Sequence, residues 1–169
     1  MEESNEPIAN EQFQKDSERF TRLVTFSPDP LVLILKGHLL IEEQLNKFLV
    51  TGTSKPETLI DARLSFHQTL RIAQAIGGAL FSDELVLLIE KLNALRNRLA
   101  HMAEPQGIDD KLHEFELSGL TLFPGLAKIP EGPVRLYGVL QDIFAFLAGL
   151  HQGFQIMRQY NVSLPPVKR

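Results

Sequence analysis

The sequence predicts an all-α protein, a single up-and-down bundle of about five helices. Apolar residues recur at α-helical spacing along most of the chain, whereas alternating strand patterns are scarce. No internal repeat of roughly 20 to 50 residues is visible, so a solenoid is not expected. The 169 residues, 44% of them hydrophobic, suffice for one core. We expect one helical domain over 11–160, between a flexible segment at 1–10 and an extended tail at 161–169.

The N-terminal half of the chain should contain three helices. The first, over 11–26, has only a weak apolar face. Asp29-Pro30 supplies an N-cap and a proline at the first helical position, which predicts a second helix ending near Val50. Ser54-Lys-Pro-Glu57 has the pattern of a capping box, with Ser and Glu three residues apart. It predicts a third helix that runs to the glycine pair at 77–78.

The C-terminal half should contain two long helices and a short one. Ser82 is a suitable N-cap for a helix that should stop at Glu104-Pro105, because the residue before a proline is restricted, so His101 is expected in the last turn. A short helix is expected over 108–117. The segment 120–133 holds two glycines and three prolines and is predicted to be a loop, either functional or mobile. Helical periodicity returns over 134–160.

The helix that Ser82 opens has two distinct faces. A stripe predicted to be buried consists of Leu85, Leu88, Leu92, Leu95, Leu99 and Met102. A second, polar face consists of Asn93, Asn97 and His101 at positions i, i+4 and i+8, with Ala94 and Ala100 beside them and Arg96 between the two faces. Since these flanking residues are small, a second helix can approach closely at this face.

Arg96, Asn97 and His101 are the candidate catalytic residues. An imidazole exchanges protons near neutral pH, and a guanidinium can bind a phosphate with two parallel hydrogen bonds. Together they suit phosphodiester transfer on RNA, where the 2′-hydroxyl of the substrate is the nucleophile. In this interpretation Arg96 binds the phosphate, His101 acts as acid or base, and Asn97 positions either of them. No metal or cofactor is needed.

The proposed reaction needs a base and an acid, but one such helix supplies one histidine. Two copies packed about a two-fold axis would bring two His101 and two Arg96 side chains into one cleft. We therefore expect a homodimer with Asn93, Asn97, Ala100 and His101 at or near its interface. The residues also allow a simpler interpretation, since arginine and histidine commonly bind the last carbonyl groups of a helix.

The sequence around Arg96 resembles a known family. Arg96-Asn97 followed by His101, after Leu92-Asn93-x-Leu95, resembles the R-polar-x(3–5)-H signature of HEPN domains, small all-helical domains found in many prokaryotic ribonucleases and toxins. The segments 36–45 and 64–77 resemble the first two core helices of the HEPN branch that includes the mannitol-operon repressor family. The resemblance covers about 30–160 and implies a HEPN-like bundle.

The resemblance implies that Arg96 and His101 form the catalytic pair and that Asn97 fills the polar position. The implied function is a metal-independent endoribonuclease, of the kind found in toxins and phage defence. The alternative is a non-catalytic regulator or adaptor that binds a protein or nucleotide partner. Members that pair with a nucleotidyltransferase antitoxin have Tyr two places after the histidine. Here Met102-Ala103 follows, so an adenylylating antitoxin is not implied.

The composition of the chain argues against a nucleic-acid coat protein, a secreted protein and a membrane protein. A net charge of −4 and a pI near 5.7 argue against a general nucleic-acid coat protein, although Lys91, Arg96 and Arg98 concentrate positive charge beside the candidate site. The chain has no cysteine, an acidic N-terminus unlike a signal peptide, and apolar runs too short to span a membrane. We expect a cytoplasmic protein with no membrane partner.

Metal chemistry has no support in the sequence. The other histidines, His38, His67, His113 and His151, lack HxxxH or HExxH spacing and are interpreted as packed or surface residues. Glu42 stands on a helix expected to face the candidate site, where it could orient His101 or Arg96. An exposed Glu42-Glu43 pair is the alternative.

Overall fold

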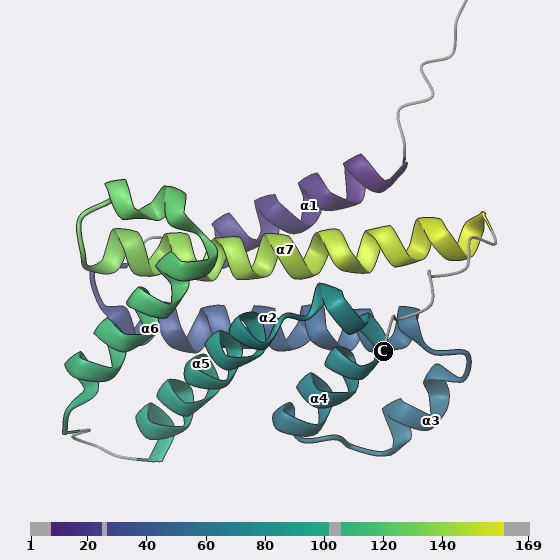
Figure 1. Ribbon diagram of the computed structural model, residues 1–169, viewed down its shortest axis with the longest axis horizontal. Coiled ribbons are helices and arrows are strands. Elements are labelled where there is room, and N and C mark those ends of the chain that lie inside the picture. Colours follow the sequence, from purple (N-terminus) through teal and green to yellow (C-terminus); the bar gives the residue numbers. More distant parts are fainter. Residues whose placement is uncertain (1–7, 25–26, 102–105, 161–169) are drawn as a thin grey trace, which may run out of the picture.

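The computed structural model describes residues 8–24, 27–101 and 106–160. Within these ranges every regular element is a helix, which confirms the all-α prediction. The elements are α1 (Ile8–Leu23), α2 (Pro30–Gly52), α3 (Pro56–Asp61), α4 (Phe66–Gly77), the 3₁₀ segment η1 (Gly78–Leu80), α5 (Asp83–His101), α6 (Ile108–Leu122), the 3₁₀ segment η2 (Pro124–Lys128) and α7 (Pro133–Gln159) (Figure 1). These ranges hold more helices than the five predicted. The predicted tail at 161–169 and the predicted helix stop at Glu104-Pro105 lie outside the described residues.

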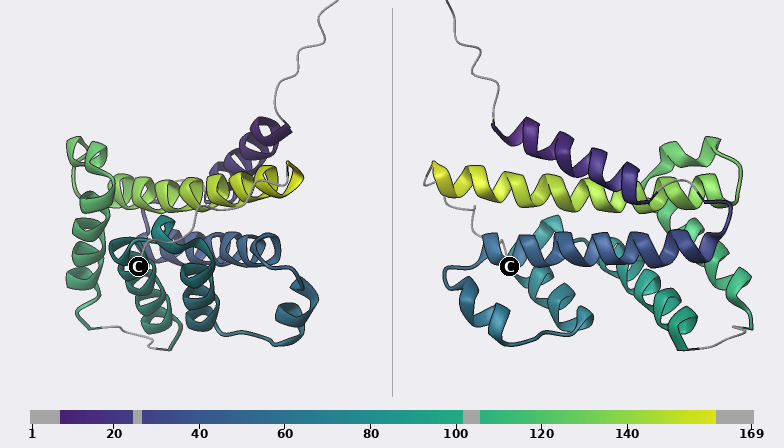
Figure 2. Two further views of the ribbon diagram at one scale, coloured as in Figure 1. Left: turned by 45° about the vertical axis from the view of Figure 1, so that its right-hand side comes forward. Right: turned by 180° about the vertical axis from the view of Figure 1, so that it is seen from behind.

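Helices α2 and α7 form the centre of the bundle. They run side by side in the same direction, with α1 on the far side of α7 and with α4 and α5 on the opposite side of α2 (Figures 1 and 2). The up-and-down arrangement therefore does not hold for the central pair. The buried residues at the centre of α2 and α7 include Leu33, Ile34, Ile41, Leu45, Leu140, Ile143, Phe144 and Leu147.

A glycine allows the two central helices to approach each other. A Cβ atom built on Gly37 of α2 would lie 2.9 Å from the methyl carbons of Leu140 on α7. Leu140 is fully buried, so its side chain has little space into which it could move. The absence of a side chain at Gly37 is therefore a condition of this packing.

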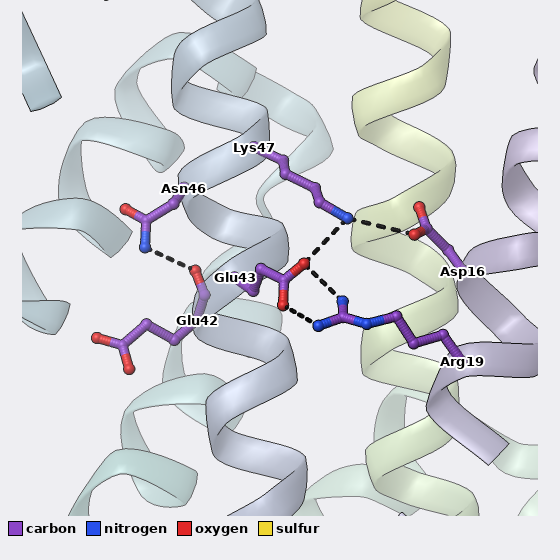
Figure 3. A network of polar contacts seen from close by, with 6 residues as sticks. All are labelled: Asp16, Arg19, Glu42, Glu43, Asn46 and Lys47. Atoms are coloured by element: carbon purple, nitrogen blue, oxygen red, sulfur yellow. Dashed lines mark hydrogen bonds and ion pairs between the residues drawn. The ribbon is translucent and has the colours of Figure 1, made fainter. Parts of the chain in front are cut away.

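Helix α1 begins and ends three residues earlier than predicted. It packs on α7 through buried Phe20, and Val24 just after it is also buried. A polar network joins it to α2 (Figure 3). Arg19 donates two hydrogen bonds to the carboxylate of Glu43, at 2.6 and 2.7 Å, and Lys47 bridges that carboxylate and Asp16 at 3.2 Å each.

The prediction of one helix from Ser54 to Gly77 is wrong. Helix α3 starts after Lys55 without a side-chain cap and ends at Asp61. The capping box lies at Ser65 instead: Gln68 N donates to Ser65 Oγ at 3.4 Å, and Ser65 N donates to Gln68 Oε1 at 2.9 Å. This reciprocal pair satisfies the first amide groups of α4, so the chain breaks between the two helices. Arg63 in the break has a φ of +48°.

The prediction of a loop over 120–133 is wrong for most of 120–128, whereas 129–132 is indeed not helical. Helix α6 continues to Leu122, five residues beyond the predicted end, and η2 follows it directly. Leu126 of η2 packs over Gly138 of α7, where a Cβ atom would lie 2.9 Å from it. Two of the three prolines that suggested a loop, Pro124 and Pro133, stand at the starts of η2 and α7, where no amide hydrogen is needed.

Helix α7 has the length and apolar composition of a membrane-spanning helix. In this structure its buried side chains pack against α1 and α2, and a helix buried in a protein core can have the same length and composition.

The close approach of α2 and α7 predicts opposite effects for two Gly→Ala substitutions. Gly37→Ala should lower the free energy of unfolding by about 1–3 kcal/mol through overpacking against Leu140. Gly149→Ala on α7 should raise it by about 0.5–1 kcal/mol, because no atom lies within 4 Å of its Cβ position and alanine favours the helix. Urea unfolding of both variants checks this, and equal effects would contradict the packing argument.

Candidate active site

Helix α5 forms where the sequence predicts it. Leu85 N donates to Ser82 Oγ at 3.3 Å, which confirms the N-cap, and acidic Asp83 and Glu84 occupy the first turn. The predicted stripe is buried at Leu85, Leu88, Leu92 and Leu95 and half-buried at Leu99. Met102 lies outside the described residues. The core side of α5 thus fixes the direction of its polar side chains.

Arg96 and Asn97 form a pair, whereas His101 stands apart from them. Arg96 Nη1 donates to Asn97 Oδ1 at 3.0 Å, and both side chains are half-buried. His101 is exposed at the last residue of α5. Five residues along a helix correspond to a rotation of about 140° and a rise of about 7.5 Å. His101 and Arg96 of one chain therefore leave α5 in different directions.

Among the described residues, Arg96 has no carboxylate partner, and its hydrogen bond to Asn97 differs from the contacts of the other cations of this helix end. Lys91 donates to Ser118 Oγ on α6 at 2.7 Å, and Arg98 donates to the carbonyl oxygen of Gln106. From the sequence, Lys91 and Arg98 are expected to add to the positive charge of Arg96 beside the candidate site. Both side chains instead contact polar groups of α6 and of the turn before it. The guanidinium of Arg96 has one described hydrogen bond, to the side-chain amide of Asn97.

His38 on α2 is the residue that the sequence analysis missed. Its side chain is 2% exposed, and its Nε2 lies 3.1 Å from Asn93 Oδ1 on α5. Its ring stacks on Phe66 at the start of α4, with centroids 4.5 Å apart. Because an amide oxygen only accepts hydrogen bonds, His38 carries its proton on Nε2. Its Nδ1 is buried without a hydrogen-bond partner.

Burial lowers the pKa of His38 to about 4, the hydrogen bond to Asn93 raises it in part, and the positive charge of Arg96 lowers it further. His38 is therefore a neutral imidazole near neutral pH, placed within the electrostatic field of Arg96. Both Asn93 and Arg96 belong to the segment that the sequence analysis selected. The sequence contains no signal for the crossing of α2 and α5 that brings His38 to them.

Glu42 faces His38 and not the residues it was expected to orient. Its Oε2 lies 3.8 Å from His38 Nδ1, one helical turn along α2, and its side chain is 34% exposed. No described hydrogen bond or ion pair joins it to Arg96 or His101. Glu43 is not an exposed partner of Glu42, because it belongs to the network with α1 (Figure 3).

The remaining histidines lie elsewhere. His67 and His113 form surface ion pairs with Glu90 and Glu131, at 3.6 and 2.7 Å, and His151 is buried with a pKa lowered by burial. Over the ranges that the structure describes, no group of three or more histidine, cysteine or carboxylate side chains is arranged to hold a metal ion.

No protein-family model matches this chain, and neither a curated protein nor a solved structure matches it. The fold and the site by themselves define an all-helical bundle with a polar cluster where α2, α4 and α5 meet. The cluster comprises His38, Glu42, Asn93, Arg96 and Asn97.

The low pKa of His38 predicts a loss of stability in acid. The unfolded chain binds a proton at this residue below pH 6.5, whereas the folded protein does so only near pH 4. The contribution of neutral His38 to the free energy of unfolding is thus fully present above pH 6.5 and is lost as the pH falls toward 4. The loss should reach about 3 kcal/mol at most, and His38→Gln should remove it. Urea unfolding between these pH values tests this, with exposed His113→Gln as the control that keeps the wild-type slope.

Proposed function

We propose that this protein is a metal-independent endoribonuclease of the HEPN type that cleaves RNA as a homodimer in the cytoplasm, in the manner of toxins and phage-defence proteins. The observation that carries the proposal is the state of Arg96. Its guanidinium is half-buried, is oriented by Asn97 at 3.0 Å and pairs with no carboxylate of the described residues. A cation in this state has donors left for a phosphate.

A homodimer accounts for the separation of Arg96 and His101 on one helix. Leu87, Ala94 and His101 stand seven residues apart and are all exposed, with Leu87 51% exposed, so they form one uncovered stripe along α5. Packing this stripe in parallel against the same stripe of a second copy, about a two-fold axis along the helices, buries Leu87 and brings His101 of each chain toward the other. The site then holds two imidazoles and two guanidinium groups.

The shared site supports a two-histidine mechanism. One neutral His101 takes the proton of the 2′-hydroxyl, and the 2′-oxygen attacks the adjacent phosphorus. Arg96 stabilises the charge that develops on the non-bridging oxygens. The bond from phosphorus to the 5′-oxygen breaks, and His101 of the second copy, in its protonated form, donates a proton to that oxygen. The products are a 2′,3′-cyclic phosphate and a 5′-hydroxyl, so DNA is not cleaved.

Substitution of either candidate residue should abolish most of the cleavage. Arg96→Ala and His101→Ala should each reduce the rate on single-stranded RNA by on the order of 10²-fold or more. Cleavage by the wild type should persist in EDTA. Arg158→Ala and His113→Ala are matched controls at other surface sites and should keep the wild-type rate. If wild type cleaves no RNA while dimeric, the non-catalytic regulator that binds a protein or nucleotide partner becomes the better proposal.

The α5 stripe also predicts which surface mediates dimerisation. Ala94→Trp places a large ring within the stripe and should shift the protein from dimer to monomer at micromolar concentration. Ala79→Trp adds the same ring at another exposed alanine and should leave the dimer intact. Sedimentation velocity distinguishes the two. A monomeric wild type in this range would contradict the shared site.

A further inference from the structure

A pocket lies near the C-terminal end of α2, between that helix, α3 and the residues that follow α3. It has a volume of about 280 Å³ and is lined by Asn46, Leu49, Val50, Leu59, Arg63 and Leu64. Four of these six residues are leucine or valine, and none is aromatic. The pocket's volume is slightly below the range of about 300–1,000 Å³ that is usual for ligand pockets, so it has space only for a small molecule, and its lining suits one with an aliphatic body.

Arg63, at the rim of the pocket, has a backbone conformation that is unfavourable for most residues other than glycine. Its φ of +48° lies in the left-handed region, where it is the one non-glycine residue of the described chain. Such conformations are unfavourable for residues with a Cβ atom and are concentrated at functional sites. Glycine would adopt this φ without strain, yet an arginine stands here.

The strained backbone is accompanied by an unpaired charge. Arg63 is exposed, and no carboxylate of the described residues forms an ion pair with it. Its guanidinium and the amide of Asn46 are the polar groups of an otherwise aliphatic lining. An apolar floor with a cation at the rim complements a molecule that has an aliphatic chain and an anionic end.

We propose that this pocket binds a medium-chain aliphatic carboxylate, with the chain among Leu49, Leu59 and Leu64 and the carboxylate on Arg63. A planar guanidinium binds a carboxylate through two parallel hydrogen bonds, which gives the ligand a fixed orientation. The site is separate from the cluster around Arg96, so the proposal does not depend on the nuclease activity.

Octanoate is the probe that tests the proposal, with acetate and octanol as its charged and apolar halves. Calorimetry on the full chain should detect binding of octanoate, at least about ten-fold weaker binding of octanol, and no binding of acetate. Methyl resonances of Leu59 and Leu64 should shift on titration. Equal affinity for octanol and octanoate, or shifts confined to other residues, would overturn the assignment.

Two substitutions of Arg63 separate the ligand site from a structural role. Arg63→Gln should weaken octanoate binding by about ten-fold or more, and Arg63→Gly should do the same while raising the melting temperature, because glycine relieves the strain. Arg71→Gln, at an exposed arginine of α4, should leave octanoate binding unchanged. Wild-type affinity in both Arg63 variants would overturn the proposal. Binding that appears only after removal of 161–169 would assign the pocket to the chain's own C-terminal segment instead.

Discussion

The close contact between α2 and α7 is the constraint on which the rest of the structure depends. Gly37 lets α7 approach α2, and the apolar side chains of both helices fill the space between them. With one side of α2 covered by α7, its other side is available to α4 and α5. His38 follows Gly37 directly and points to that other side, where Asn93 and Phe66 enclose it.

The electrostatics of the candidate site follow from this placement. His38 is buried and neutral, so it adds no positive charge beside Arg96. A protonated imidazole there would compete with Arg96 for an anion and would oppose the burial of both groups. The neutral ring instead holds Asn93, while Asn97 on the next turn of α5 holds the guanidinium of Arg96. Two amides thus orient the polar side of α5 without neutralising its arginine.

Local signals predicted most of the helices, and their failures have identifiable causes. Asp29, Pro30 and Ser82 were sufficient to place the starts of α2 and α5, because a cap acts within its own helical turn. The capping box at Ser65 was missed because Ser54 offered the same pattern eleven residues earlier. The segment 120–133 was misjudged because its leucines pack onto α7, a contact that periodicity within the segment does not reveal. Only the part of the candidate site that lies on α5 was predictable from the sequence, because local patterns do not reveal contacts between helices. Arg96 and Asn97 belong to one helix, whereas His38 reaches them only through the crossing of α2 and α5.

The central pair also affects the order in which the bundle can form. Gly37 and Leu140 are about a hundred positions apart in the sequence, whereas α4, α5 and α6 are joined by short connections and contact their neighbours in the chain. A contact between distant positions requires the loss of more chain entropy before it stabilises the protein. We therefore expect slower folding than in a bundle whose helices pack mainly against the helices next to them in the sequence. The α4–α5–α6 segment can collapse locally, but His38 is enclosed only when α2 joins it, and α2 is held in turn by the last helix of the chain. We therefore expect the polar cluster to be completed late in folding, when the two ends of the domain have met.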